Sequence, residues 1–567
     1  MNNWDEDWED DCNDDWIVGR DDEEMGDKEN QWAIRKPAEY PEVAISAFTE
    51  TGREESTIVV PKQRAYIDRK PAITSHLADT PCATLGVQGL LDQLNTTLVT
   101  SYSLDNPFLS SLLEDCIKNN YDFGMAYGRL RRIWYIDDWS TVQDVLWRWS
   151  DEDQKERREA IIGNRIVRPQ LPPRRVWDLY SNRVVPWWLK PRTGNTTYKY
   201  RQWPKPISHA WADEKDRTAV WTPINGKEWP APIPKDADLN LIRIEMLNLG
   251  QEYTWEDLRT EEWKLDVPTI GRVYAHSPSV CYLSGLGRPL TLKEGDLESD
   301  RSWFRRAWTL QEAEYGMVIA GDTPDGPLHA ECKDGKYKTE LLTRFHKQLD
   351  RTRHTYRMRD ALEEMQKRVS TNPVDKIAGL ALLMKSRWIP AYYESASLED
   401  AWSALVDSMT GYRRAELFVL CPEPGDRGPK WRPSWKQAMT KPVLPYQIDY
   451  DLDQGIDWDE TVDVDWCDAW CIEGFVRGLA VVEGGDRHGE FIVGCDDEIE
   501  RFKITTAHTY PIPEDTYTLI YYNSWTLPNA CVVGRSLPGG RFEKVSVLET
   551  SDTRSMYIPK TRRCILL

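Results

Sequence analysis

The sequence predicts an α/β protein, in which a parallel sheet with flanking helices follows a helical region and precedes a β-rich domain. Three observations predict this fold class. Apolar residues recur at helical spacing between Pro81 and Asp153. The short apolar run Ser279–Leu283 is bounded by proline and glycine, which is typical of a buried parallel strand. From Cys421 onward, short β-type runs alternate with proline and glycine, which indicates a separate β domain.

Length and composition divide the chain into segments, because 567 residues are too many for one hydrophobic core. The first thirty residues hold fourteen acidic and two basic side chains, whose mutual repulsion opposes packing. We therefore expect an acidic disordered tail (1–40), a mostly helical region (41–165), the α/β domain (166–390), a helical connector (391–420) and the β-rich domain (421–567).

Charge and cysteine usage limit the function classes. The chain carries 93 acidic against 72 basic residues, a balance that repels phosphate backbones and argues against nucleic acid as a partner. Its eleven cysteines form no C-x-x-C pair, so we expect neither a disulfide framework nor a metal site. The sequence has no apolar run long enough for a membrane span and no signal peptide, so a cytoplasmic protein is expected.

The α/β domain opens with a segment of irregular backbone, since several prolines between 172 and 191 prevent a long helix. After it, PISHAWAD (206–213) predicts a short strand that ends in polar turn residues. Ligands of open α/β sheets bind beyond the carboxyl ends of strands, and Ser208 and Asp213 fall at such an end. The competing interpretation is a capped turn, with His209 as a packed imidazole.

The following elements alternate between helix and strand. Residues 238–250 have the spacing of an amphipathic helix closed by a glycine, and residues 279–283 are the apolar strand described above. We also expect helices at 263–274, 359–367 and 372–384, a strand at 317–320, and a helix that begins with a capping box at Ser397.

The string RSWFRRAWTLQE (301–312) predicts a helix of about four turns, with Ser299 as its N-cap. In such a helix Arg305, Trp308 and Glu312 share one face. This spacing alone most often describes a helix flank, with the tryptophan in the core and the charges at its rim.

Two motifs of the sequence resemble those of the fungal heterokaryon-incompatibility (HET) domain. Its third motif runs roughly R-x-W-T-L-Q-E, and the matching residues are Arg306, Trp308, Thr309, Leu310, Gln311 and Glu312. Its first motif is similar to the segment that holds Ser208, His209, Trp211 and Asp213. The Asp375–Lys376 pair before a small apolar helix also resembles the segment that follows the signature in this family.

The resemblance implies a fold like that of Toll/interleukin-receptor (TIR) domains, with a flavodoxin-like parallel sheet covered by helices on both faces. It also implies a role in nonself recognition and regulated cell death. In TIR domains that cleave NAD, the catalytic glutamate follows a tryptophan by four residues, as Glu312 follows Trp308. The resemblance therefore implies that NAD is a substrate and not a cofactor, that Glu312 is catalytic, and that the substrate-binding residues are Ser208, Trp211, Asp213, Arg305 and Trp308.

One carboxylate is sufficient for this reaction. Nicotinamide leaves as a neutral molecule from a cationic pyridinium, so the leaving group needs no proton. A glutamate that stabilises the ribosyl cation can carry the step, whereas O-glycosidases use two carboxylates.

The sequence departs from the family between 252 and 262, where the second motif is absent. HET domains carry there an apolar strand of the form W-x-D-x-L-C-I-x-Q, but here Trp255 leads directly into EDLRTEEW. Without a central strand, the neighbouring strands would lose ladder hydrogen bonds. Either an adjacent segment pairs in its place, or the domain is degenerate, or the sequence is the product of a misread splice junction.

Two other functions stay open at this stage. One is a signalling module without enzymatic activity that acts by self-association and through an unidentified protein partner, which the absent motif favours. The other is a carbohydrate-active enzyme, suggested by 27 tryptophans and abundant acidic residues, since sugar rings stack on indoles.

Overall fold

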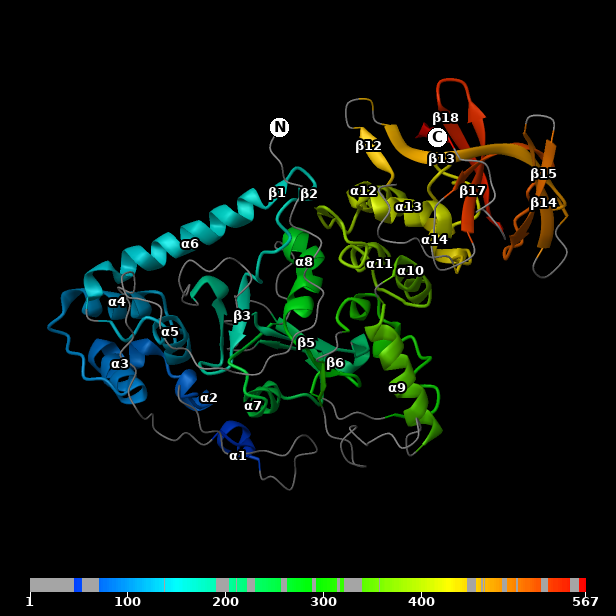
Figure 1. The fold of residues 1–567 in the computed structure, drawn as a ribbon. Helices are drawn as coiled ribbons and strands as arrows, with labels where there is room; N and C mark the ends of the chain where they lie inside the picture. Colours follow the sequence, from blue (N-terminus) through cyan, green and yellow to red (C-terminus); the bar gives the residue numbers. More distant parts are fainter. Residues whose placement is uncertain are drawn as a thin grey trace, which may run out of the picture.

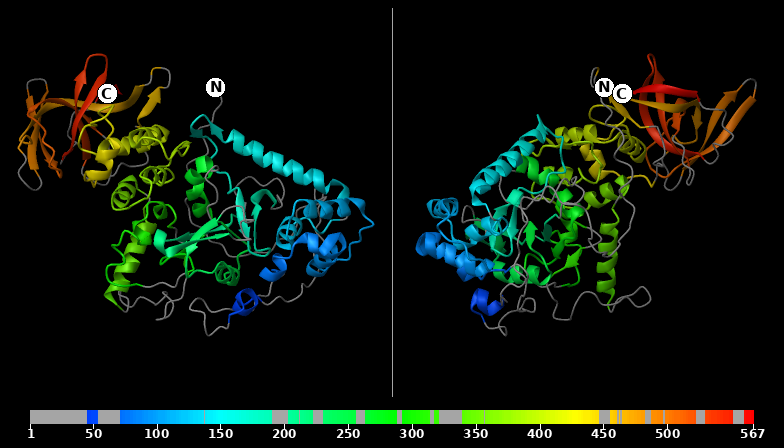
Figure 2. Two further views of the ribbon diagram at one scale, coloured as in Figure 1. Left: turned by 180° about the vertical axis from the view of Figure 1, so that it is seen from behind. Right: turned by 60° about the vertical axis from the view of Figure 1, so that its left-hand side comes forward.

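The computed structural model has a helical region, a central α/β domain and a C-terminal sheet, in this order along the chain (Figure 1). Figure 2 shows the N-terminal helices and the C-terminal sheet at opposite sides of the central domain. The structure describes residues 45–53, 71–136, 138–189, 203–210, 212–221, 230–255, 263–287, 292–313, 317–320, 339–355, 357–445, 455–459, 462, 464–481, 487–495, 498–521, 529–550 and 560–567. The expectation of an acidic disordered tail (1–40) concerns residues outside these ranges.

The N-terminal region is helical, as the apolar spacing predicts. Its helices are α1 (Ala47–Thr51), α2 (Ser75–Ala78), α3 (Cys82–Leu98), α4 (Pro107–Lys118), α5 (Phe123–Leu130) and α6 (Val142–Glu159). In α3 the buried side chains Leu90, Leu91 and Leu94 recur at helical spacing. Helix α4 begins at a proline, and the side chain of Asn106 accepts hydrogen bonds from the first free backbone amides. Local sequence therefore accounts for these elements.

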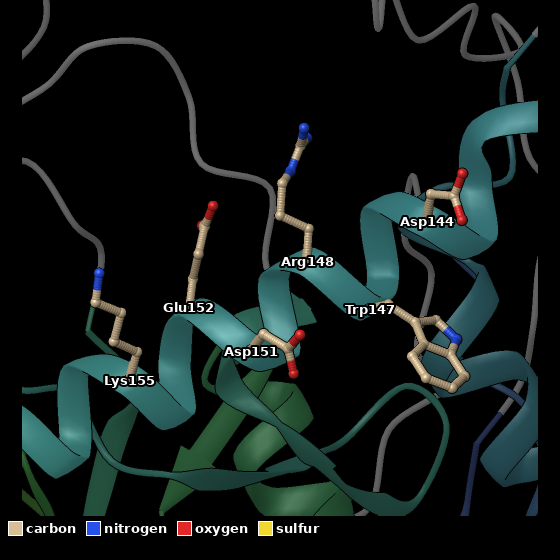
Figure 3. Close-up of a pocket in the computed structure, with 6 residues that line it drawn as sticks. All are labelled: Asp144, Trp147, Arg148, Asp151, Glu152 and Lys155. Carbon is tan, nitrogen blue, oxygen red and sulfur yellow. The ribbon is translucent and has the colours of Figure 1, made fainter.

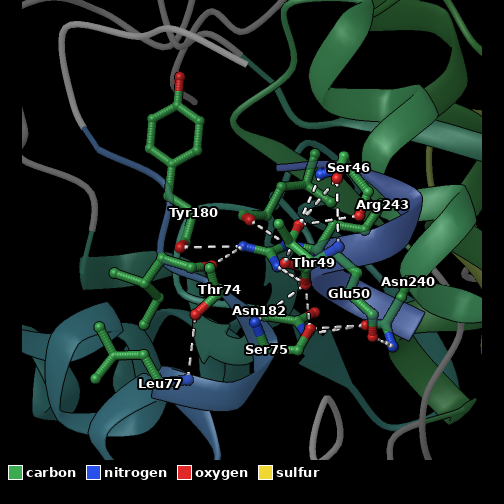
Figure 4. Close-up of polar contacts among 12 residues, drawn as sticks. Ser46, Thr49, Glu50, Thr74, Ser75, Leu77, Tyr180, Asn182, Asn240 and Arg243 are labelled. Carbon is green, nitrogen blue, oxygen red and sulfur yellow. Dashed lines mark hydrogen bonds and ion pairs between the residues drawn. The ribbon is translucent and has the colours of Figure 1, made fainter. Parts of the chain in front are cut away.

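A buried polar network attaches α1 to α7 (Leu239–Asn248) of the central domain (Figure 4). The carboxylate of Glu50 accepts hydrogen bonds from Arg243 Nη1 at 3.1 Å and from the amide of Ser75 at 3.0 Å. Arg243 Nε and Nη2 also donate to the carbonyl oxygens of Leu179 and Ile73, each at 2.7 Å. Both charged side chains are fully buried, and each is compensated by the other and by several hydrogen bonds. The network therefore fixes the N-terminal segment to the α/β domain.

The central sheet has six strands in the order β10-β9-β5-β8-β3-β4. These strands are β3 (Arg175–Asp178), β4 (Arg183–Pro186), β5 (Lys205–His209), β8 (Tyr253–Trp255), β9 (Val280–Tyr282) and β10 (Val318–Ile319). The four strands from β10 to β8 pair in parallel, whereas β3 pairs with β8 and β4 in antiparallel fashion. The parallel sheet predicted from the sequence is thus part of a mixed sheet.

Strand β8 occupies the part of the sheet where the sequence shows no apolar strand. It has three residues, and Thr254 lies opposite both Lys205 of β5 and Trp177 of β3. The hydroxyl of Thr254 adds a hydrogen bond to the carbonyl oxygen of Lys205 at 2.8 Å. A segment of three residues therefore fills the position between β5 and β3.

The two faces of the central sheet are covered by different parts of the chain. Alternate residues such as Ile207 and Val280 pack against α7 and the N-terminal helices. Cys281, on the opposite face, packs with Trp303, Phe345 and their apolar neighbours, which come from the 292–313 segment and α9 (Glu340–Arg353). Helix α8 (Trp263–His276) and the hairpin of β6 (Arg217–Trp221) and β7 (Pro230–Pro234) complete this domain.

The prediction of one helix at 301–312 is wrong. The structure has two short 3-10 turns, Trp303–Arg305 and Trp308–Leu310, separated by Arg306 in extended conformation. At this break the backbone pairs with Val369: the amide of Ala307 donates to the Val369 carbonyl at 3.0 Å, and the Val369 amide donates to Arg305 at 2.6 Å. Tertiary pairing thus overrides the local helix propensity, and Arg305, Trp308 and Glu312 do not form one helical face.

The ends of the 166–390 segment lie side by side. Strands β1 (Ile161–Ile162), β2 (Arg165–Ile166) and β11 (Ile389–Pro390) form a small sheet in which Ile389 pairs with Ile166. The helices that follow α9 along the chain are α10 (Met358–Gln366), α11 (Val374–Ala378), α12 (Leu398–Ser408), α13 (Gly411–Leu420) and α14 (Trp435–Thr440). The side chain of Ser397 caps α12, as its capping box predicts.

The C-terminal part is a β-rich sheet that closes on itself. Its strands are β12 (Asp457–Asp459), β13 (Val464–Arg477), β14 (Arg487–Cys495), β15 (Glu498–Thr506), β16 (Asp515–Tyr521), β17 (Asn529–Leu537), β18 (Arg541–Thr550) and β19 (Lys560–Leu566). The pairing of β13 with β16 closes the strands β13-β14-β15-β18-β17-β16 into a ring, and β12 extends β13 outside this ring. The described strands of this region begin at Asp457, after α14, and not directly at Cys421.

Candidate functional site

A pocket of about 200 Å³ lies beyond the carboxyl ends of β5 and β9. Ala210 follows β5, and Leu283 and Ser284 follow β9; all three line the pocket. Along the chain, β5 is the first parallel strand of the sheet and β9 is the third. The second, β8, lies on the other side of β5, so β5 and β9 are neighbours in the sheet. The strand order reverses between them, and ligands of open α/β sheets bind at such switch points. The topology therefore makes this pocket the candidate site.

The pocket has an apolar wall and a charged rim. Buried side chains of Leu283, Leu297, Trp303, Phe304 and Phe345 form the wall. The polar residues that line it are Asp213, Asp216, Ser284, Asp296, Ser299, Arg301 and Ser302. Asp213 and Arg301 form an ion pair across the rim. Such a lining suits a flat or apolar group that carries hydroxyls.

Behind the wall, Ser208 joins the two motifs that the sequence separates by 104 residues. The Ser208 hydroxyl donates to Glu312 Oε2 at 2.5 Å and accepts from Trp303 Nε1 at 2.7 Å. Ser208 is 1% exposed and Glu312 is 6% exposed. Of these three hydrogen-bonded residues, Trp303 also lines the pocket. Glu312 is thus connected to the pocket wall through Ser208 and Trp303.

Burial controls the charge of Glu312. Removal of the carboxylate from water raises the pKa of Glu312 to about 7, although the hydrogen bond from Ser208 and the nearby Arg368 and Arg306 act to lower it. Arg368 is itself 1% exposed, and its Nη1 donates to the Arg306 carbonyl at 2.6 Å and to Thr309 Oγ1 at 2.7 Å. A carboxyl group with a pKa near neutrality can change its charge under physiological conditions, which is typical of functional sites.

The structure brings Ser208 and Glu312 together and places Asp213 at the pocket rim. It does not place Arg305 or Trp308 at the pocket. Arg305 pairs with Asp300 at 3.4 Å on the surface. The indole of Trp308 packs against α8 and the ring of Tyr392, with its centroid 6.4 Å from that ring.

The break at Arg306 interrupts the predicted helix, and Trp308 packs against α8 and α11. Trp211 lies outside the described residues. The His209 imidazole is packed, as the second interpretation of this segment expects. Its Nδ1 lies 3.2 Å from the carbonyl oxygen of Ala210, and burial lowers the pKa of the imidazole.

Sequence reasoning missed Trp303, Arg301 and Asp296 as pocket residues. The first two belong to the string 301–312, but an assumed helix directs attention to Trp308 in place of Trp303. Arg301 precedes the matched motif residues, and its pairing with Asp213 is visible only in the structure. Asp296 belongs to neither motif, and nothing in the sequence distinguishes it from other surface aspartates.

A second hollow, of about 420 Å³, lies on the outer face of α6 (Figure 3). All six of its lining residues come from this one helix, among them Trp147, whose side chain is 67% exposed. The other five are charged: Asp144, Arg148, Asp151, Glu152 and Lys155. A single helix surface cannot surround a ligand, so we do not regard it as a functional site.

Within the described part of the chain, no group of three or more His, Cys, Asp or Glu side chains is arranged to hold a metal ion. Helices long and apolar enough to cross a membrane are likewise absent from the residues that the structure describes. Comparisons with family models, with curated proteins and with solved structures found no match to this chain.

Proposed function

We propose that residues 166–390 form a HET-like domain that acts in nonself recognition and regulated cell death by cleaving the N-ribosyl bond of NAD. The observation that carries this proposal is the hydrogen bond from Ser208 to Glu312 next to the switch-point pocket. Each residue belongs to a segment that resembles a HET motif, and a chance resemblance gives no reason for the two segments to meet at the functional edge of a sheet.

The strand order supports a flavodoxin-like domain. Numbered along the chain, β5, β8, β9 and β10 are strands one to four, and their spatial order is 2-1-3-4. Flavodoxin-like sheets begin in the same order. The antiparallel strands β3 and β4 extend this sheet beyond its second strand, which departs from the simple pattern.

In the proposed reaction the C1′–N bond of the nicotinamide riboside unit breaks, and its electron pair leaves with neutral nicotinamide. Water then adds to the ribosyl cation and releases one proton to solvent. Ionised Glu312 stabilises the cation electrostatically. Because Trp303 and Ser208 separate Glu312 from the pocket, the proposal requires the Trp303 side chain to move from Ser208 when substrate binds.

The experiment is an assay of nicotinamide release from NAD by the purified full-length chain. We expect release by the wild type and a loss of at least about a hundredfold in Glu312→Gln and Glu312→Ala. Glu294→Gln is the matched control, since Glu294 is exposed and pairs with Arg344 away from the pocket lining. Because the carboxylate must be ionised, kcat/KM should rise with pH and level off above about 7. Equal release by wild type and Glu312→Gln would reject Glu312 as the catalytic residue, and no release by the wild type would reject the enzyme.

A signalling module without enzymatic activity is the second candidate function. The observation that favours it is the 6% exposure of Glu312, which does not line the pocket. In this case Glu312 is a structural carboxylate, and self-association carries the signal. Cell killing that persists in Glu312→Gln while nicotinamide release is absent from every variant would support this function over the enzyme.

A further inference from the structure

We propose that Cys467 and Cys564 form a redox-sensitive pair, which hydrogen peroxide converts to a disulfide that ties β19 to β13 in the C-terminal sheet. Both cysteines are reduced and buried in the structure. The pair lies outside residues 166–390, so the proposal goes beyond the function proposed for that domain. It depends on the pairing of the two strands, on a third thiol and on the surroundings of the Cys564 sulfur.

The backbone already places the two cysteines at the separation that a disulfide needs. Strands β13 and β19 pair in antiparallel fashion, and Cys467 lies directly opposite Cys564. Residues opposite each other in such a pair have their Cα atoms about 4.5 to 5.5 Å apart. A disulfide joins residues whose Cα atoms are about 4.4 to 6.8 Å apart. The bond can therefore form without separating the strands.

A third thiol, that of Cys471, touches Cys564 but is not its bonding partner. The two sulfurs are 3.5 Å apart. In the backbone, however, Cys471 lies opposite Lys560, which is four residues from Cys564. Four residues of straight strand span about 13 Å, about twice the largest Cα separation that a disulfide joins. We therefore assign Cys471 as a hydrogen-bonding neighbour and Cys467 as the partner.

The surroundings of Cys564 favour its thiolate, which is the form of cysteine that reacts. Hydrogen bonds with the thiols of Cys467 and Cys471 lower the pKa of Cys564, and the nearby Arg562 acts in the same direction, while burial opposes them. Cys421 has no such neighbours, and burial raises its pKa to about 11. The two side chains are equally inaccessible, since Cys564 is 6% and Cys421 is 8% exposed. Cys421 is therefore an internal control.

The oxidation balances with hydrogen peroxide as the only co-reactant. The Cys564 thiolate attacks one peroxide oxygen, so that an S–O bond forms, the O–O bond breaks, and the hydroxide released takes up the thiol proton as water. The Cys467 sulfur then attacks the sulfenic acid. An S–S bond forms, the S–O bond breaks, and hydroxide leaves with the Cys467 proton as a second water. Each sulfur loses one electron, and peroxide gains two.

The disulfide would restrain a strand that joins the sheet to the helical connector. The residue after β19, Leu567, accepts a hydrogen bond from the amide of Trp431 at 3.0 Å, and its own amide donates to Phe542 at 3.0 Å. The cysteines of the pair belong to the same buried apolar cluster as Trp431. A covalent tie at Cys564 therefore limits opening of β19 and of its contact with the connector.

Peptide mapping of the oxidised full-length chain tests the pair. The reduced protein is treated with hydrogen peroxide, denatured in an alkylating reagent that blocks thiol exchange, and digested without reductant for mass spectrometry. We expect a linked peptide that contains Cys467 and Cys564, and oxidation of Cys421 that is at least about tenfold slower. Free, alkylated cysteines at both positions, or sulfinic acid at Cys564 without a link, would overturn the proposal.

Serine variants test the choice of partner. Cys471→Ser should keep the link, because Cys471 only donates to the Cys564 sulfur. Cys467→Ser should abolish the link and leave a sulfenic acid at Cys564. A link between Cys564 and Cys471 in the wild type would refute the assignment, and so would loss of the link in Cys471→Ser. The wild-type map needs no substitution, so it decides the question even where a variant fails to fold.

Hydrogen exchange measures whether the disulfide restrains β19. The amides of residues 560–566 should exchange at least about threefold more slowly in the oxidised wild type than in the reduced protein, and a thiol reductant should reverse the change. Peroxide should leave these rates unchanged in Cys467→Ser. Equal rates in the oxidised and reduced wild type would show that the disulfide does not act as a switch.

Discussion

Asp178→Asn should destabilise the protein by about 3 kcal/mol, because it removes one partner of a buried ion pair. The Arg131 guanidinium donates from Nε and Nη2 to the two carboxylate oxygens of Asp178, at 2.9 and 2.7 Å. Their side chains are 2% and 0% exposed. An asparagine at 178 turns an amide group toward the guanidinium and leaves part of its charge uncompensated, although the ion pair with Glu252 remains. Denaturant unfolding of the full chain measures the change.

The same substitution at a surface pair is the control. Asp468 accepts from Arg563 in a similar two-bond geometry, at 3.0 and 2.7 Å, but both side chains are well exposed. Water and salt screen this pair, so Asp468→Asn should leave the denaturation midpoint unchanged. A midpoint shift of equal size in both variants would show that burial does not determine the strength of the Asp178–Arg131 pair.

The Arg131 cluster explains why the sequence was misleading about the central sheet. Arg131 reaches from α5 to Asp178 at the end of β3 and to Glu252 just before β8, and thereby holds the short strand against its neighbour. A strand of three residues has too little apolar pattern to be identified in a sequence, and its position depends on a side chain 121 residues away. The absence of a motif therefore did not mean the absence of a strand.

Elements with strong local signals were predictable. The helix at 238–250 has its cap at Asp238 and a left-handed glycine at Gly250, and both signals are visible in the sequence. The segment 301–312 has equally good helical spacing, yet the pairing of Arg306 with Val369 replaces the helix. Long-range backbone pairing of this kind has no local signature, so the error was not avoidable from one sequence.

The candidate site was predictable to the extent that its residues belong to motifs. Ser208, Asp213 and Glu312 were identified from two motif-like segments, and the structure places all three at or near the switch-point pocket. The position of Trp303 between them depends on the irregular backbone of 301–312, so sequence reasoning chose Trp308 in its place.

Glu312→Gln should abolish part of the pH dependence of stability. Burial raises the pKa of Glu312 from 4.5 to about 7 in the folded protein, so between these values the folded state holds a proton that the unfolded state has lost. Stability from this group is therefore present below about pH 4.5 and is lost as the pH rises through 7. Glutamine is neutral throughout and lacks this effect. The free energy of unfolding of the variant minus that of the wild type should increase by roughly 2 to 3 kcal/mol between pH 5 and 8.

Denaturant unfolding at several pH values measures this difference. The net charge of -21 makes the stability of both proteins depend on pH in the same way, so this general effect drops out of the difference. Glu294→Gln, an exposed substitution of the same chemistry, should follow the wild type across the range. Parallel curves for wild type and Glu312→Gln would mean that the carboxylate is hydrated in solution. Glu312 would then be open to the pocket without substrate, and no movement of Trp303 would be needed for it to act.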